Sequence, residues 1–362
     1  MIITIICNFF AVFIASLASY SYKHKGYLFL SFLLIFIFLA LRYDFGNDYM
    51  GYYEYFSKVQ KASVQDIMNF QEYRSFGFME FGFTWLNKLF PNFFLMVAVL
   101  SLFSCYVYYD AIKSYVIPYL AWVSVFMFVF DPYLMLVQSS AMRQTIAICF
   151  FIYSIRYLIE RNFWKFGLLI LIGSLFHKSA ILLLPIYFLI TPRQWNKSIL
   201  IVLIIFYLTI SLFGYLFLPL LENIVRLLFP QYHESYMTTI VGNPLNSGIG
   251  FLFLSLIFLF IIWSHNKGST SNIIISKLSI VGFVLYPVDI YFNMFSRIGM
   301  YFFPVLILSL PFAISLQRSR SLRFLIVSIF ILYYAYQFYD FFQSPIWAEK
   351  FSQYKINLIQ GI

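Results

Sequence analysis

The chain has 362 residues; 62% are hydrophobic, 10% are charged, and Lys and Arg exceed Asp and Glu by ten. Soluble proteins are about 45–50% apolar and about 25% charged, so this chain has too few charges to cover a soluble surface. We therefore expect a single integral membrane domain over residues 1–362. Its apolar runs are continuous rather than alternating, which favours an all-α polytopic protein over a transmembrane β-barrel.

The hydropathy of the chain predicts about twelve crossings, because a span needs about 20 apolar residues and broken helices can be shorter. Two short runs between 166 and 190 meet at His177 and are expected to form short helices that turn within or just outside the membrane. An amphipathic piece over 80–90 is expected to enter the membrane without crossing it. The longer runs are 3–20, 26–41, 92–109, 115–130, 142–159, 198–218, 249–264, 278–292, 298–316 and 324–340.

Loop charges predict the orientation. One set of alternate loops holds 13 basic and two acidic residues, whereas the other holds 11 basic and 12 acidic residues. Basic residues accumulate in cytoplasmic loops, so we expect the first set inside and both termini outside. This asymmetry explains the basic pI without a nucleic-acid partner. The basic residues of the first set are Lys23, Lys25, Lys113, Arg156, Arg161, Lys165, Arg193, Lys197, Lys267, Lys277, Arg318, Arg320 and Arg323.

The segments expected outside are long, whereas the cytoplasmic loops are short. The outer segments cover 42–91, 221–248 and the C-terminal tail 343–362. A protein with this distribution is expected to act at the outer face of the membrane.

The densest polar cluster follows the second span and contains Arg42, Asp44 and Asp48 around Gly46. Gly46 permits a tight turn that brings the three side chains together. A guanidinium binds phosphate in a bidentate manner, which makes Arg42 a candidate phosphate ligand. The alternative is simple anchoring at the interface, with the neighbouring tyrosines in the aromatic belt. Those tyrosines are Tyr49, Tyr52 and Tyr53.

Glu80 stands alone in an apolar and aromatic stretch. Such a carboxylate is either paired with an arginine, such as Arg74, or faces a polar cavity. In the second case burial makes it a candidate acid or base.

Arg143 and Arg297 are predicted at the outer ends of separate spans, at the level of Arg42. Their position opposes the positive-inside trend, so each needs a reason. Snorkelling to lipid phosphate explains one arginine. Three arginines at one depth favour a phosphate-binding site.

His177 breaks an apolar run and precedes Lys178. A lone membrane histidine can be a hydrogen-bonded packing residue. At a helix break near the outer face, however, it is also well placed to act as a base near neutral pH.

The sequence holds no metal-ligand spacing, P-loop, glycine-rich nucleotide motif or GxSxG elbow. We therefore expect no metal and no cofactor, and a substrate that carries its own activated bond.

Together these residues resemble the EpsG-type family of bacterial polysaccharide polymerases, a branch of the Wzy class. The resemblance covers most of the chain; Asn47 departs from it, because a small residue, often Thr, is expected there. The matching pieces, in order, are Arg42 with Gly46-Asn47-Asp48-Tyr49 and Tyr52-Tyr53, Glu80-Phe81-Gly82-Phe83, Arg143-Gln144, Phe176-His177-Lys178-Ser179-Ala180, and Asn293 with Arg297.

The resemblance implies polymerisation of lipid-linked oligosaccharide repeat units (O-antigen, capsule or exopolysaccharide) on the outer face of the bacterial inner membrane. The implied donor is a glycan on undecaprenyl diphosphate, and the implied partners are membrane lipid and a protein that regulates chain length. We assign His177 as the first choice of base, Asp48 as the second, and Glu80 as an orienting residue. The diphosphate ligands would be Arg42, Arg143, Arg297 and Lys178, and the other substrate contacts Asp44, Tyr49, Tyr52 and Gln144.

Three other functions remain open. An O-antigen ligase would need the same arginines and base, and only the order of the motifs favours a polymerase. A transporter or flippase would be expected to show a charged central cavity and related halves. A membrane acyltransferase would also use a histidine, but its donor would be expected to enter from the cytoplasm.

Overall fold

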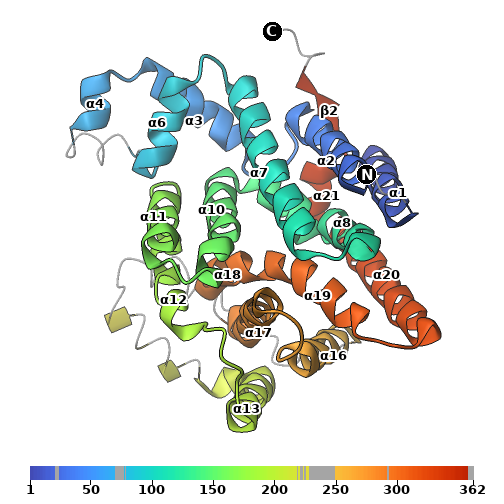
Figure 1. The fold of residues 1–362 in the computed structure, drawn as a ribbon. Coiled ribbons are helices and arrows are strands. Elements are labelled where there is room, and N and C mark those ends of the chain that lie inside the picture. The colour runs from blue at the N-terminus through green and yellow to red at the C-terminus, as the bar shows by residue number, and fades with distance from the viewer. Residues whose placement is uncertain are drawn as a thin grey trace.

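The computed structural model describes residues 1–20, 24–69, 77, 79–217, 219–220, 223, 226–227, 249–291 and 293–357. It is almost entirely helical, as the sequence predicts (Figure 1). The α-helices are α1 (Ile2–Leu17), α2 (His24–Ala40), α3 (Tyr49–Lys61), α4 (Val64–Met68), α6 (Phe81–Leu89), α7 (Phe93–Tyr115), α8 (Ala121–Phe130), α9 (Gln138–Ser140), α10 (Met142–Ile159), α11 (Phe163–Ser174), α12 (Ile186–Leu189), α13 (Lys197–Phe213), α16 (Ile249–Ser264), α17 (Thr270–Tyr291), α18 (Asn293–Phe302), α19 (Leu306–Ser315), α20 (Arg320–Gln343) and α21 (Pro345–Phe351).

Short 3₁₀- or π-helical segments and one pair of strands lie between or beside these α-helices. The strands β1 (Arg42–Tyr43) and β2 (Lys355–Ile356) pair antiparallel, with Arg42 opposite Ile356. The short turns are η1 (Ala18–Tyr20), η2 (Pro118–Leu120), the π-helical η3 (Tyr133–Val137), η4 (Lys178–Leu183), η5 (Gly214–Phe217) and η6 (Phe303–Val305).

Most apolar runs form helices near their predicted bounds, and polar residues begin several of them. The helix over the run 278–292 begins earlier, at Thr270, and the run 298–316 is divided between α18 and α19 by η6. The side-chain oxygens of Asn92, Asn162, Asn196 and Ser319 accept hydrogen bonds from the first turns of α7, α11, α13 and α20. These caps satisfy backbone N–H groups that have no partner inside the helix. The amphipathic piece expected over 80–90 is the helix α6.

Within the described residues, five helical segments are long and apolar enough to cross a membrane: Phe93–Tyr115, Lys197–Phe217, Thr270–Asp289, Ser296–Ser315 and Arg320–Gln343. A sixth is formed if Pro118–Phe130 and Tyr133–Ser140, which meet at a bend of 67°, count as one span. Shorter apolar helices accompany them, among them α1, α2, α11 and α16. The chain is thus a multi-pass helical protein by length and composition, but the expected count of about twelve crossings is not confirmed.

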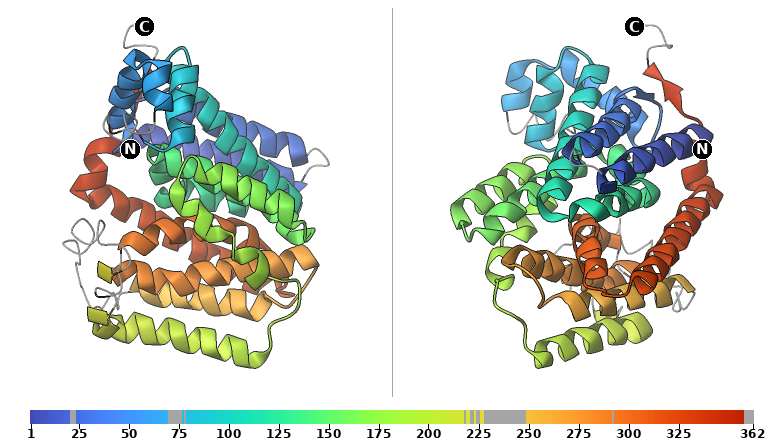
Figure 2. Two further views of the ribbon diagram at one scale, coloured as in Figure 1. Left: turned by 90° about the vertical axis from the view of Figure 1, so that its left-hand side faces the viewer. Right: turned by 45° about the vertical axis from the view of Figure 1, so that its right-hand side comes forward.

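The described loops of the two sets lie at opposite ends of the helices (Figure 2). At one end, Arg161 donates hydrogen bonds to the carbonyl oxygens of Tyr187 and Ile190, both at 2.9 Å. Arg156 pairs there with Asp110. At the other end lie α3, α4, α6 and α21. The charge asymmetry of the loops therefore corresponds to a difference between the two ends of the helices.

The segment over 42–91 differs from the long external loop that the sequence predicts, because much of it is helical. Helices α3, α4 and α6 form a separate core of aromatic side chains against the start of α7. Tyr55 and Phe83 stack within it, at a centroid distance of 6.1 Å. Of the other two outer segments, 221–248 lies almost wholly outside the described residues, and the tail 343–362 contains α21 and β2.

Candidate functional site

A carboxylate from one motif bridges the basic side chains of two others. The Oε2 atom of Glu80 lies 2.5 Å from Nη1 of Arg143, and its Oε1 atom lies 3.5 Å from Nδ1 of His177. Glu80 precedes α6, Arg143 is in the first turn of α10, and His177 lies between α11 and η4. Three segments separated by 63 and 34 residues in the sequence thus meet at one charged centre.

A glycine allows this approach of α6 to the break after α11. The amide nitrogen of Gly82 donates a hydrogen bond to the carbonyl oxygen of Leu175 at 2.9 Å. A Cβ atom on Gly82 would lie 2.9 Å from both that oxygen and the Cβ atom of Leu175. The absence of a side chain at Gly82 therefore lets Glu80 reach His177.

The guanidinium of Arg143 stands at the N-terminus of α10, where the positive end of the helix dipole disfavours a cation. Glu80 compensates that charge, and Tyr52 lies on the other side, with its hydroxyl 3.4 Å from Nε of Arg143. Burial alone would raise the pKa of Glu80, but His177 and Arg143 outweigh it and lower this pKa to about 2. Glu80 is therefore ionised at neutral pH. The predicted pairing of Glu80 with an arginine is present, with Arg143; Arg74 lies outside the described residues.

His177 leaves the helical path, with φ −151° and ψ 110°, and the residue is only 8% exposed. Neither ring nitrogen makes a hydrogen bond within the described part of the chain, and Nδ1 lies 3.5 Å from the Glu80 carboxylate. A buried imidazole with Nδ1 beside a carboxylate leaves Nε2 to accept a proton.

Asp48 joins this site through the turn at Gly46. Gly46 has φ +122°, and a Cβ atom on it would lie 2.9 Å from the side chain of Ser140. The Ser140 hydroxyl accepts a hydrogen bond from the amide nitrogen of Asp48 at 3.0 Å. Partial burial raises the pKa of Asp48, and the charges of Arg143 and Arg297 oppose that rise.

Two hydrogen bonds attach α18, which carries Arg297, to this site. Gln144 donates from Nε2 to the carbonyl oxygen of Arg297 at 2.8 Å. The hydroxyls of Ser179 and Tyr301 lie 3.1 Å apart. The sequence alone indicates no role for Ser140, Ser179 or Tyr301. Of these three residues, only Ser179 lies in one of the motifs singled out in the sequence.

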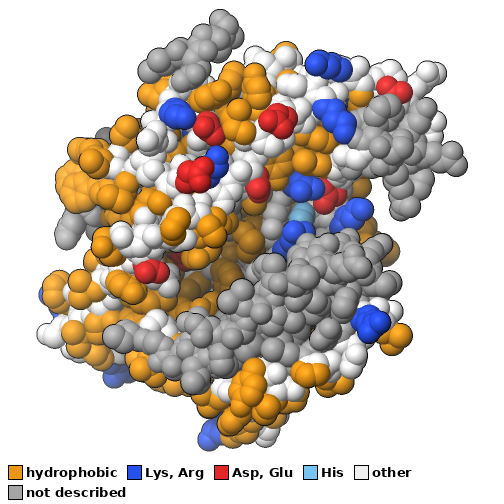
Figure 3. Space-filling model, turned by 180° about the vertical axis from the view of Figure 1, so that it is seen from behind, with side chains coloured by type: hydrophobic (Ala, Val, Ile, Leu, Met, Phe, Trp, Pro, Cys, Tyr) orange, Lys and Arg blue, Asp and Glu red, His pale blue; other side chains and the backbone are white. Residues whose placement is uncertain are grey.

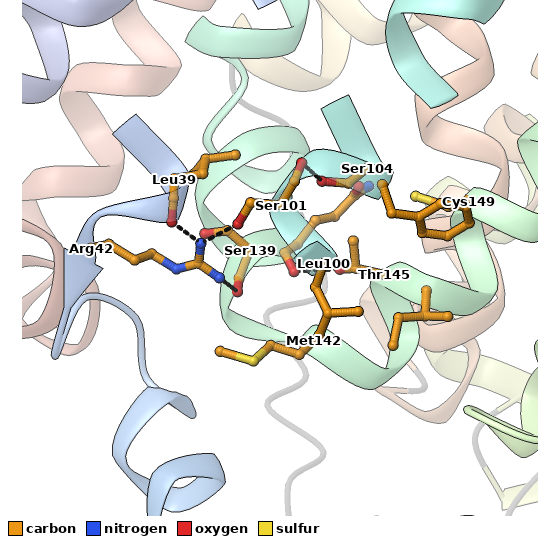
Figure 4. Close-up of a pocket in the computed structure, with 12 residues that line it drawn as sticks. Leu39, Arg42, Leu100, Ser101, Ser104, Ser139, Met142, Thr145 and Cys149 are labelled. Atoms are coloured by element: carbon orange, nitrogen blue, oxygen red, sulfur yellow. Dashed lines mark hydrogen bonds between the residues drawn. The ribbon is translucent and has the colours of Figure 1, made fainter. Parts of the chain in front are cut away.

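Arg42 has a different environment from that of Arg143 (Figure 4). Its buried guanidinium donates to the carbonyl oxygens of Leu39 and Ser139 and to the hydroxyl of Ser101. Leu39 and Ser139 lie in the last turns of α2 and α9, where carbonyl groups lack helical partners. One guanidinium thus caps two helices beside a cavity of about 20 Å³, which is room for about one water molecule. The expected direct role of Arg42 at a diphosphate does not fit this burial.

The structure separates two further predicted residues from the charged centre. Asp44, with φ +45°, pairs with Lys355 at 3.2 Å. The buried hydroxyl of Tyr49 donates to the carbonyl oxygen of Arg42 at 2.9 Å. Both therefore hold the turn in place.

Lys178 is exposed next to His177. No group of three or more His, Cys, Asp or Glu side chains that could hold a metal ion occurs in the part of the chain that the structure describes.

The fold and this charged centre define a multi-pass helical membrane protein with a site at one end of its helices. Residues 25–356 match the EpsG family, so the chain belongs to that family of polysaccharide-polymerase-type membrane proteins. Neither the curated proteins nor the solved structures include a match to the chain.

Proposed function

We propose that this protein polymerises oligosaccharide repeat units carried on undecaprenyl diphosphate, for an O-antigen, capsule or exopolysaccharide. The donor is the growing glycan on its diphosphate lipid, and the acceptor is a single lipid-linked repeat unit. Family membership supports the polymerase class. The observation that carries the proposal is the Glu80 carboxylate between Arg143 and His177. It holds a cation that can bind the leaving diphosphate, Arg143, close to a side chain that can accept a proton, His177.

In the proposed reaction, a hydroxyl oxygen of the acceptor attacks the anomeric carbon of the donor. The bond from that carbon to the diphosphate oxygen breaks, and the diphosphate keeps the electron pair. The hydroxyl proton passes to Nε2 of His177, with Asp48 as the second choice of base. An imidazole is the side chain most often used as a general base near neutral pH.

Glu80 is the orienting residue of this scheme. Its carboxylate favours the tautomer of His177 that carries its proton on Nδ1 and leaves Nε2 free to accept one. The same carboxylate fixes Arg143 from the other side. Glu80 therefore keeps the base and a phosphate ligand at a defined separation, which is the purpose of pre-organisation in an active site.

Positive charge on the leaving diphosphate comes in this proposal from Arg143, Arg297 and Lys178. A diphosphate is already a good leaving group, so stabilisation of its developing charge is enough and no metal is required. Arg42 acts indirectly, by capping α9 just before the helix that carries Arg143. Gln144 and Tyr52 hold Arg297 and Arg143 in place.

The proposed site faces the periplasm, at the inner membrane of a bacterium. The loop charges support this orientation, because the site lies at the end of the helices away from the basic loops. The apolar helices supply the surface for the prenyl chain, and a partner protein is proposed to set the chain length.

The test is extension of a labelled lipid-linked repeat unit by the purified protein in detergent, without a membrane gradient. The expected product of the wild type is a ladder of longer glycans, which the His177→Ala variant does not make. The Glu160→Gln variant, at an exposed position on the opposite side, is the control and is expected to behave as the wild type. Transport into vesicles without extension would indicate a transporter, and transfer only to a lipid A acceptor would indicate a ligase.

A further inference from the structure

Asp289 is a carboxylate that the proposed reaction does not use. It lies near the end of α17, and both of its carboxylate oxygens are buried without a hydrogen-bond partner among the described residues. Buried polar groups in proteins are nearly always satisfied, so an orphaned pair of oxygens requires an explanation. An ionisable residue in a membrane-spanning helix is also rarely without a function.

The surrounding helices make room for this carboxylate. A Cβ atom on Gly299 of α18 would lie 2.3 Å from Oδ2 of Asp289, so a larger residue there would displace this carboxyl group. Pro287 lies inside α17, two residues before Asp289, and a proline there removes one hydrogen bond from the helix. In a membrane helix, the carbonyl group freed by a proline has to be satisfied by neighbouring groups.

A hydroxyl group of the same helix and a carboxyl group that follows another helix lie near Asp289. Tyr286 lies within electrostatic reach of both Asp289 and Asp131, and Asp131 follows α8, where its Oδ1 accepts a hydrogen bond from the amide of Tyr133 at 3.0 Å. On one face of the molecule, charged side chains of both signs gather beside a hollow lined by hydrophobic side chains (Figure 3). Asp131 is therefore satisfied by the backbone, whereas Asp289 is not.

One helix separates Asp289 from the charged centre. Arg297 and Gly299 are two positions apart on α18, so they project to opposite sides of that helix. Gln144 of the charged centre binds the carbonyl oxygen of Arg297. The width of a helix with its side chains is about 10 Å, a distance that an oligosaccharide of several sugars can span.

We propose that Asp289, with Tyr286 beside it, forms a second glycan-binding subsite across α18 from the Glu80 centre. A carboxyl group whose two oxygens have no partner among the described residues can accept hydrogen bonds from a ligand with several donors. Sugar hydroxyls supply such donors. This inference rests on the proposed polymerase function and assigns the subsite to the acceptor repeat unit.

The test uses initial rates of extension by the purified protein, with polymer-bearing donor held fixed and the single lipid-linked repeat unit titrated. We expect Asp289→Asn to raise the KM for the repeat unit about tenfold or more, because the variant replaces one acceptor oxygen by an amide NH₂ group and leaves a sugar hydroxyl without its acceptor. We expect kcat to change less than about threefold. The His177→Ala variant, which removes the proposed base, should instead lose most of its kcat. The KM for the donor and the midpoint of thermal unfolding should stay as in the wild type, because the carboxyl group accepts no hydrogen bond from the residues that the structure describes.

Gly299→Ala is the second variant, since its new methyl group would push against the carboxylate, and it should raise the same KM. Glu160→Gln, which removes one negative charge from an exposed turn, should leave every constant unchanged. An Asp289→Asn protein with an unaltered KM for the repeat unit, or one that no longer folds, overturns the subsite. A wild-type protein that extends nothing refutes the polymerase function instead.

Discussion

The backbone of Gly82 contacts that of Leu175 directly, with 2.9 Å between the amide nitrogen and the carbonyl oxygen. This contact holds the start of α6 against the end of α11, so that Glu80 and His177 lie on neighbouring backbone segments. The distance between the carboxylate and the imidazole is therefore set by a close approach of two backbones.

The Gly82→Ala variant tests this dependence. The added methyl group would lie 2.9 Å from backbone and side-chain atoms of Leu175, so the two segments must separate. Overpacking of this kind costs about 1–3 kcal/mol, and we expect polymerisation to fall at least tenfold as Glu80 withdraws. Gly51→Ala is the matched control, because nothing lies within 4 Å of its new methyl group. Equal glycan ladders from both variants would show that the contact does not govern the site.

The residues of the charged centre should differ in their effects on activity. We expect His177→Ala to reduce the rate of extension about 10²–10⁴-fold, the range for loss of a general base. Arg143→Lys should also be strongly impaired, because an ammonium cannot reproduce the planar guanidinium between Glu80 and Tyr52. In cells, both variants should insert stably and accumulate single repeat units on the lipid. Long ladders at normal expression would exclude the catalytic role of that residue.

The fold was largely predictable because the spacing of apolar runs determines where helices begin and end. The runs 92–109 and 324–340 appear as the helices Phe93–Tyr115 and Arg320–Gln343. The segment over 42–91 was less predictable. Its helices are stabilised by aromatic contacts with one another, such as Tyr55 with Phe83, and such tertiary contacts do not produce a strong local pattern.

The site was predictable only in part, because sequence shows which residues are polar but not which way they face. Glu80, Arg143 and His177 were singled out as charges in apolar surroundings, and the structure brings them together. Arg42 had the same signature, yet it caps helix ends in the interior. A cation after a hydrophobic helix can bind substrate or cap helix ends. Which of these it does depends in part on a carbonyl group 97 residues away in the sequence.

Arg42 should therefore affect stability and activity together. The Arg42→Lys variant loses hydrogen bonds to helix-end carbonyls, and bonds to charged groups contribute about 1.5–3 kcal/mol each. We expect the midpoint of thermal unfolding in detergent to fall, with activity falling in parallel. Arg143→Lys is the contrasting variant, since it should lose activity with a smaller change in the midpoint. If Arg42→Lys unfolds as the wild type does but makes no polymer, Arg42 contacts substrate after all.

The low pKa of Glu80 predicts how its stabilising effect depends on pH. Its pKa is about 2 in the folded protein and 4.5 in a model compound, so the folded state favours the ionised form. The resulting stabilisation is fully present above about pH 4.5 and is lost as the pH falls toward 2. We expect the difference in unfolding midpoint between wild type and Glu80→Gln to be constant near pH 6–7 and to shrink below pH 4.5. Glu160→Gln should show no such trend, and a gap that widens in acid would contradict the ion pair with Arg143.

Tyr354 in the C-terminal segment is expected to hold the turn that contains Gly46 and Asp48. Its ring stacks on that of Phe38 at 4.5 Å, and its hydroxyl donates to the Phe38 carbonyl oxygen at 2.6 Å. Truncation of a packed aromatic residue costs about 3–5 kcal/mol, so Tyr354→Ala should lower the unfolding midpoint. Because the turn carries Asp48 toward Arg143, extension should fall as well, by about tenfold.

Tyr336→Ala is the control for that variant, because Tyr336 is 61% exposed on α20 and should tolerate the change. Tyr354→Phe separates the two contributions, since it keeps the stacking and removes only the hydrogen bond. We expect Tyr354→Phe to retain most of the activity, because the net contribution of one hydrogen bond is about 1 kcal/mol. If Tyr354→Ala were as active and as stable as Tyr336→Ala, the ring of Tyr354 would have no part in shaping the site.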